Sequence, residues 1–265
     1  NVLSMTDILS LYDSITLGEM SGIRLMNRTD TKFVTTKQML RKLLLLAKDD
    51  YCTQEIDGER IAPYYTVYFD TPDNAMYCRH ETGHANRQKL RIRSYAKSGQ
   101  SFLEVKTKNN HGRTHKKRVT MPTFNPQEPQ HDLMFRPQDD CFKDYEEFLA
   151  NNLRYDPTIL TPKVENHFNR ITLVNKQKTE RLTIDFDLAF DNIRNGQHME
   201  MGSIVIIELK RDGRQPSPIL KHLMLLGIKP MGFSKYVIGY ALTDDTLRRN
   251  RIKPRLRKIA KLMAQ

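Results

Sequence analysis

The chain has 265 residues, with 43 lysines and arginines against 31 acidic residues, and its formal net charge is +12. This charge favours an anionic partner such as phosphates, nucleic acid or an acidic membrane. No apolar run approaches the roughly 18 residues of a membrane-spanning helix. The three cysteines are far apart and form no CxxC pair, so their pattern indicates neither a disulfide framework nor a zinc site. A reducing cytoplasm is therefore the expected compartment.

Hydrophobic periodicity and capping residues predict a chain of mostly sequential strands with a few helices between them. Composition does not shift sharply anywhere, so residues 1–265 are expected to form one domain, with a core at 28–240. In chain order, the patterns predict a helix at 6–20, a strand at 28–34, a helix at 36–48, a polar loop at 49–60, a strand at 64–69, a short helical piece at 75–82, three strands within 89–119, a proline-rich loop at 121–137, a helix at 142–153, strands at 161–174, 180–190 and 203–210, a helix at 216–226, a short strand or turn at 233–239, and a basic helix at 244–265.

The three strands within 89–119 each place cationic side chains on one face and more apolar ones on the other. A solvated sheet face usually mixes both signs of charge, whereas this face is heavily positive and holds a single carboxylate. It predicts a concave site for a polyanion, together with a metal ion that accompanies the polyanion. The residues on this face are Lys89, Arg91, Arg93, Glu104, Lys106, Lys116 and Arg118.

A short pattern, apolar-Glu-apolar-Lys, occurs on two strands that are far apart in the sequence. Glu104 and Lys106 form the first copy, and Glu208 and Lys210 form the second. At strand spacing, the Glu and Lys of each copy lie on one face about 7 Å apart. A carboxylate among lysines can hold a hard cation whose other ligands are phosphates. An ordinary cross-strand ion pair is the alternative interpretation of each copy alone.

The strand at 180–190 alternates cleanly. Its pattern places Arg181, Thr183, Asp185 and Asp187 on one face, and Leu182, Ile184, Phe186 and Leu188 on the other. Asp185 is a candidate metal ligand, and a partner for a neighbouring arginine is an equally good interpretation of this residue.

Taken in order, these pieces resemble the triphosphate tunnel metalloenzymes, and among them the polyphosphate polymerase domain of the vacuolar transporter chaperone (VTC) type. The resemblance covers about residues 28–239, and each piece is short. The matching pieces are Lys32 in an early strand, Tyr68-Phe69-Asp70, Arg91 with Arg93, Glu104 with Lys106, Lys116 with Arg118, Phe168 with Arg170, Arg181 with Asp185, Glu208 with Lys210, and Phe233-Ser234-Lys235.

The resemblance implies an α+β fold, an antiparallel eight-stranded β-barrel tunnel with flanking helices. It implies a basic tunnel that binds ATP or another triphosphate, inorganic polyphosphate, and Mn²⁺ or Mg²⁺. Five residues would contact the reacting phosphates, five more would bind substrate, and three are candidate metal ligands. In that order they are Arg91, Arg93, Lys106, Arg181 and Lys210; Lys32, Lys116, Arg118, Arg170 and Lys235; and Glu208, Glu104 and Asp185.

One departure from the wider superfamily bears on the branch. The superfamily opens with E-x-E-x-K, and this chain has Arg28, Asp30 and Lys32 instead. Loss of both glutamates disfavours the adenylate cyclase and thiamine-triphosphatase branches. It favours the polymerase branch, in which Glu208 is the expected metal ligand and Glu104 a secondary candidate.

Three classes of function remain open at this stage: phosphoryl transfer, binding without turnover, and RNA binding. Transfer of a terminal phosphoryl group to another phosphate would make polyphosphate, and transfer to water would make the chain a tripolyphosphatase. A binding module would hold polyphosphate or nucleotide without turnover. The basic residues at 248–261 allow RNA binding, although an amphipathic helix packed on the barrel explains them as well and no DNA partner is expected. A membrane or protein partner is not indicated by any motif.

Overall fold

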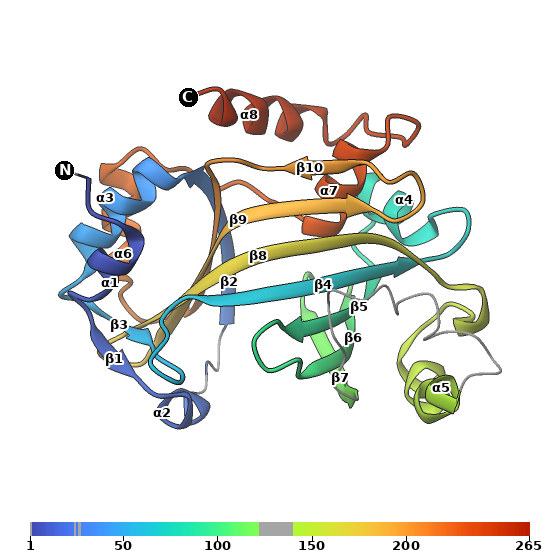
Figure 1. The fold of residues 1–265 in the computed structure, drawn as a ribbon, viewed down its shortest axis with the longest axis horizontal. Coiled ribbons are helices and arrows are strands. Elements are labelled where there is room, and N and C mark those ends of the chain that lie inside the picture. The colour runs from blue at the N-terminus through green and yellow to red at the C-terminus, as the bar shows by residue number, and fades with distance from the viewer. Residues whose placement is uncertain (1, 24, 26–27, 122–139) are drawn as a thin grey trace.

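A computed structural model describes residues 2–23, 25, 28–121 and 140–265 (Figure 1). The predicted loop at 121–137 lies, except for residue 121, outside the described residues. The helices are α1 (Met5–Leu9), α2 (Leu17–Ser21), α3 (Lys37–Ala47), α4 (Ala75–Glu81), α5 (Asp140–Asn152), the 3₁₀ turn η1 (Pro157–Ile159), α6 (Pro218–Leu225), α7 (Lys235–Thr243) and α8 (Lys253–Met263). The strands are β1 (Asp13–Ile15), β2 (Arg28–Thr36), β3 (Tyr51–Gln54), β4 (Ala62–Asp70), β5 (Arg87–Tyr95), β6 (Ser101–Lys108), β7 (Thr114–Met121), β8 (Thr161–Asn175), β9 (Glu180–Asn192), β10 (His198–Glu200) and β11 (Ile204–Asp212).

Eight strands form the main path of the sheet, in the order β2-β11-β9-β8-β4-β5-β6-β7. Every neighbouring pair on this path is antiparallel, which confirms the predicted α+β fold and its eight antiparallel strands. Figure 1 shows the curl of the sheet, because β5, β6 and β7 run at a steep angle to β4 and β8. Within the described residues no pairing joins β7 to β2, so the expected barrel is a strongly curled, open sheet.

The two faces of the sheet pack differently. On the convex face, leucines and isoleucines of β8, β9 and β11 pack with α1, α3 and α6 in one buried cluster. The helix α3 begins where predicted, with Thr36 as its N-cap accepting a hydrogen bond from the Met39 amide. On the other face, α7 packs against β8 and β9 in a second cluster. Its approach is close, because a Cβ built on Gly239 would lie 2.2 Å from the Phe190 ring. Only glycine fits there.

A β-bulge corrects the predicted faces of β9. Pairing with β8 skips from His167 opposite Ala189 to Asn169 opposite Phe186, and Asp187 takes a φ of +52°. The extra residue reverses the alternation beyond it. Asp187 is therefore exposed and ion-paired with Lys37, while Leu188 packs with α7 instead of with Phe186.

Other segments also differ from the patterns. The predicted helix at 6–20 is wrong, because α1 ends at Leu9 and the short strand β1 precedes α2. The loop at 49–60 contains β3, which pairs parallel to β1. Residues 233–239 form no strand, since Ser234 caps the helix α7. The basic helix predicted at 244–265 is shorter, α8, and its apolar residues pack on the second cluster. No helix among the described residues is long and apolar enough to cross a membrane.

Candidate functional site

The concave face of the curled sheet gathers the predicted site residues from both ends of the strand order. Lys32, Glu208 and Lys210 come from β2 and β11, and Arg181 and Asp185 come from β9. Strand register places them in rows, because directly opposed residues of an antiparallel pair share a face. Two of the rows run Arg91–Glu104–Arg118 and Lys89–Lys106–Lys116, and shorter rows pair Lys32 with Glu208, Lys210 with Arg181, and Arg170 with Asp185. We call this surface, together with Lys235 of α7, the basic face.

Glu104 lies at the centre of the first wall of the basic face, formed by β5, β6 and β7. Its carboxylate accepts a 3.0 Å hydrogen bond from Arg91 Nε and lies 3.8 Å from Arg93 Nε and 3.3 Å from Lys116 Nζ. The side chain is 1% exposed. Burial opposes ionisation, but the three cations outweigh it and lower the pKa of Glu104 to about 2. The carboxylate therefore holds the basic side chains of this wall in place.

Asp185 on β9 is clamped in a similar way. It accepts two hydrogen bonds from Arg170, at 2.7 and 2.9 Å, and forms an ion pair with Lys235 Nζ at 2.6 Å. Burial opposes its ionisation, and these cations still hold its pKa well below the usual range. Both oxygens of Asp185 are thus engaged by arginine. This bidentate pair agrees with the interpretation of Asp185 as the partner of a neighbouring arginine.

Glu208 on β11 lies in different surroundings. Its nearest cation is Lys210, with Nζ 3.5 Å from Oε1, and its side chain is 19% exposed. Burial opposes ionisation, while the charges of Lys32, Lys210, Lys106 and others hold its pKa far below the usual range. No arginine clamps it among the described residues. Of the three candidate metal ligands, Glu208 is the one whose oxygens are least occupied.

Lys106 connects this first wall with a second wall of the basic face, which is formed by β2, β11 and β9. It lies on β6, yet Glu208 on β11 is among the charges that act on it, so the two strands face one another across the concave side. Burial, together with the charge of Arg91, lowers the pKa of Lys106 to about 6, and Glu208 opposes that shift. In the described part of the chain it forms no ion pair. A second anion beside Lys106 would restore its charge.

Two guanidinium groups on the basic face carry buried donors without a hydrogen-bond partner. These are Arg93 Nε and Arg181 Nε. Burial and neighbouring arginines lower the pKa of Arg93 to about 10 and also lower that of Arg181. A buried unpaired donor is costly. Phosphate oxygens are the acceptors that best match such groups.

The donor set fits a hard divalent cation of the Mn²⁺ or Mg²⁺ type. Such ions are held by one or two carboxylates plus the oxygens of substrate phosphates. Glu208 offers one accessible carboxylate next to several lysines. Glu104 and Asp185 offer oxygens that arginines already occupy. The assignment of a metal to any of the three stays a prediction.

Sequence reasoning missed two members of the site. The Tyr64 ring on β4 lies under Arg170 at 4.9 Å and near Arg93 at 5.6 Å, and it stacks on Phe168. Lys89 lies on the predicted cationic face. Its Nζ donates to Ser234 Oγ at 2.9 Å, next to Lys32, which donates to the Phe233 carbonyl. The alternation of Tyr64, Thr66 and Tyr68 was the signal for the first.

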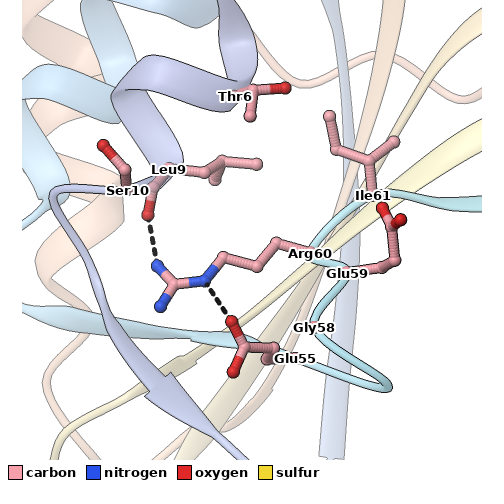
Figure 2. Close-up of a pocket in the computed structure, with 8 residues that line it drawn as sticks. All are labelled: Thr6, Leu9, Ser10, Glu55, Gly58, Glu59, Arg60 and Ile61. Atoms are coloured by element: carbon pink, nitrogen blue, oxygen red, sulfur yellow. Dashed lines mark hydrogen bonds and ion pairs between the residues drawn. The ribbon is translucent and has the colours of Figure 1, made fainter.

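A pocket outside the basic face is lined by α1 and residues 55–61 (Figure 2). Its one cation, Arg60, bridges Glu55 and the Leu9 carbonyl, and it also donates to the Tyr12 carbonyl. These bonds hold the end of α1 and leave Arg60 poorly suited to bind an anion. The basic face is therefore the stronger candidate.

Comparison with protein families gives a match that spans most of the chain. Residues 27–243 match the family model described as the VTC domain. Among solved structures, a proposed adenylate cyclase of Bacillus halodurans is 13% identical, with a TM-score of 0.47, covering 79% of this chain and 96% of that one. A proposed adenylyl cyclase of Hippeastrum, with a dominant triphosphatase activity, is 15% identical, with a TM-score of 0.45, covering 83% and 97%. At these TM-scores the likenesses carry no weight for function. No curated protein matches the chain.

Proposed function

The chain belongs to the VTC domain family, and from this premise we propose that it transfers the terminal phosphoryl group of a nucleoside triphosphate, ATP, to a growing inorganic polyphosphate chain. The observation that carries the proposal is the charge arrangement of the basic face. Glu208 lies among lysines. Lys106, which forms no ion pair among the described residues, and the Nε groups of Arg93 and Arg181, which lack hydrogen-bond partners, lie on the surrounding strands. This surface has more cations than its own carboxylates neutralise, as expected of a polyphosphate site.

Phosphoryl transfer needs positioning and neutralisation of charge more than covalent help from the protein. Lys106, Lys210 and Arg181 would hold the triphosphate, and Arg91 and Arg93 would hold the phosphates of the acceptor. Mn²⁺ or Mg²⁺ bound through Glu208 would neutralise charge on phosphate oxygens. The two clamped carboxylates would keep the arginines oriented, since Glu104 fixes Arg91 and Asp185 fixes Arg170.

The reaction itself is a single displacement. A terminal oxygen of the acceptor phosphate forms a new bond to the γ-phosphorus, and the bridging bond between the β- and γ-phosphates breaks. The nucleoside diphosphate leaves with the electrons of that bond. The acceptor oxygen is already anionic, so no base is required to remove a proton. Transfer to water at the same site would release free phosphate instead.

A product assay tests this proposal. The purified chain is incubated with ATP and Mn²⁺, and long polyphosphate is measured against free phosphate. We expect polyphosphate, and we expect Glu208→Ala to lower its synthesis by about 100-fold or more while the protein stays folded. Glu146→Gln, an exposed change on α5, is the matched control.

Two of the alternative functions have their own signatures in this assay or in polyphosphate binding. Free phosphate as the sole product would identify a tripolyphosphatase. Equal affinity for polyphosphate with and without Mn²⁺, and no product after long incubation, would identify a binding module. Unchanged synthesis in Glu208→Ala would contradict the role of that carboxylate.

A further inference from the structure

A second group of chemically active side chains lies on the convex, outer face of the sheet and points away from Arg170 and Asp185. The strands β4, β8, β9 and β10 run side by side there (Figure 1). Register aligns their outward residues in two rows. The first row is Val67–Glu165–Asp191–His198, and the second is Tyr65–His167–Ala189–Glu200. Within a few residues, this outer face thus collects two imidazoles and three carboxylates.

Three of these side chains converge. A carboxylate oxygen of Glu165, a ring nitrogen of His167 and a carboxylate oxygen of Asp191 all lie within 4.8 Å of one another. Ala189 is the row neighbour of His167, and its side chain is only a methyl group. Tetrahedral ligands about 2.0–2.1 Å from a zinc ion are separated by about 3.4 Å. Rotations of the side chains that bring the three ligand atoms closer together would therefore be needed to bind the ion.

Neighbouring residues hold two of these groups in position. The Tyr65 hydroxyl donates to Glu165 Oε1 at 2.8 Å, and its ring lies 4.8 Å from the His167 ring. His198 Nδ1 lies 2.6 Å from Asp191 Oδ1. Hydrogen bonds of this kind to the ligands are typical of metal sites, where they fix the orientation of each ligand.

The charges of this cluster favour a bound cation. Glu165 and Asp191 are directly opposed on neighbouring strands, an arrangement that is destabilising for like charges. The chain carries 43 lysines and arginines. Among the described residues, however, Asp191 and Glu200 form ion pairs with His198 and with no lysine or arginine. A divalent ion bound by both carboxylates would replace their mutual repulsion with attraction to the ion.

We propose that Glu165, His167 and Asp191 form a zinc site on the outer face of β8 and β9, separate from the basic face. An imidazole combined with carboxylates suits Zn²⁺ better than Mg²⁺, which prefers oxygen ligands alone. Water would complete the coordination of the ion. The bound ion would join β8 to β9 on the face opposite to that of Arg170 and Asp185, beyond the bulge.

Zinc titration of the whole chain tests the proposal. After dialysis against a chelator, the wild-type protein and its variants are titrated with Zn²⁺, and binding is followed by calorimetry. We expect one Zn²⁺ per chain with higher affinity than Mg²⁺. His167→Gln and Asp191→Asn should each weaken binding at least tenfold, and zinc should raise the melting temperature of the wild type but not of these variants.

Two control variants give the result its specificity. His111→Gln, in the exposed turn after β6, should bind zinc as the wild type does. Glu208→Gln should also retain the zinc, because it lies on the other face, and this separates the site from the proposed phosphoryl transfer. Thermal melting without metal verifies that each variant is folded. Equal zinc affinity in the wild type, His167→Gln and Asp191→Asn would overturn the proposal, as would equal affinity of the wild type for Mg²⁺ and Zn²⁺.

Discussion

Glu104 and Glu208 occupy the same four-residue pattern on two opposite walls of the basic face, and their surroundings differ. Glu104 is 1% exposed and is bound by two arginines and a lysine. Glu208 is 19% exposed, and the cations that lower its pKa most are lysines. Register explains the difference. Glu104 is directly opposite Arg91 and Arg118, whereas Glu208 is opposite Lys32 and Thr183.

The contrast indicates that the surroundings of the two carboxylates respond differently to a bound anion. A guanidinium group stays charged when buried and binds a carboxylate in a fixed geometry, so the arginines around Glu104 are held in place before an anion binds. A buried lysine loses its proton readily and regains it beside an anion, so the charge around Glu208 adapts to a bound anion. Asp185, held by Arg170 in two bonds, belongs with Glu104 in this comparison.

The largest difference that we expect between the walls is in stability. Glu104→Gln leaves two buried arginines without their partner and should lower the free energy of unfolding by about 3 kcal/mol. Glu208→Gln should cost about 1 kcal/mol, because the neighbouring lysines can give up protons. Urea unfolding at pH 7, followed by circular dichroism, measures both, and Glu146→Gln should stay within about 0.5 kcal/mol of the wild type. Equal losses for the two variants would remove the distinction.

Some of this comparison could be predicted from the sequence. Alternation with a period of two placed Arg91, Arg93, Glu104 and Lys106 on one face correctly, since the pleat of a strand enforces that period. It could not show which carboxylate an arginine would clamp, because this depends on the register between strands.

Two further features depended on structure that the pattern does not contain. The bulge at Asp187 reversed the faces beyond it, and no turn residue marked it in the sequence. Lys235 reaches Asp185 from the first turn of a helix, where a strand or turn was predicted. Packing of the apolar residues of α7 against Phe190 decided the matter in favour of the helix.

The pH dependence of stability sharpens the comparison further. The folded pKa of Glu104, about 2, lies below its ordinary value of 4.5, so its contribution is complete above pH 4.5 and is lost as the pH falls toward 2. The difference in unfolding free energy between the wild type and Glu104→Gln should therefore be constant from pH 7 to 5 and shrink below that. Asp185 and Glu208 titrate in both proteins, so the difference isolates Glu104. A difference that stays constant down to pH 2.5 would contradict its ion pairs with arginine.

The smallest expected effect is a proton taken up by Lys106 when an anion binds. With a pKa of about 6, Lys106 is mostly neutral at pH 7, and a bound triphosphate should raise that pKa again. Binding should then take up nearly one proton at pH 7, and this residue should strengthen binding by up to about tenfold as the pH falls from 8 to 7. Calorimetry with tripolyphosphate in two buffers of different ionisation enthalpy measures the uptake. Lys106→Arg keeps its charge throughout, so subtracting its proton uptake removes the contribution of the phosphate itself. If the wild type and Lys106→Arg take up the same number of protons, Lys106 does not gain a proton when the anion binds. The charge that adapts to a bound anion would then not include Lys106.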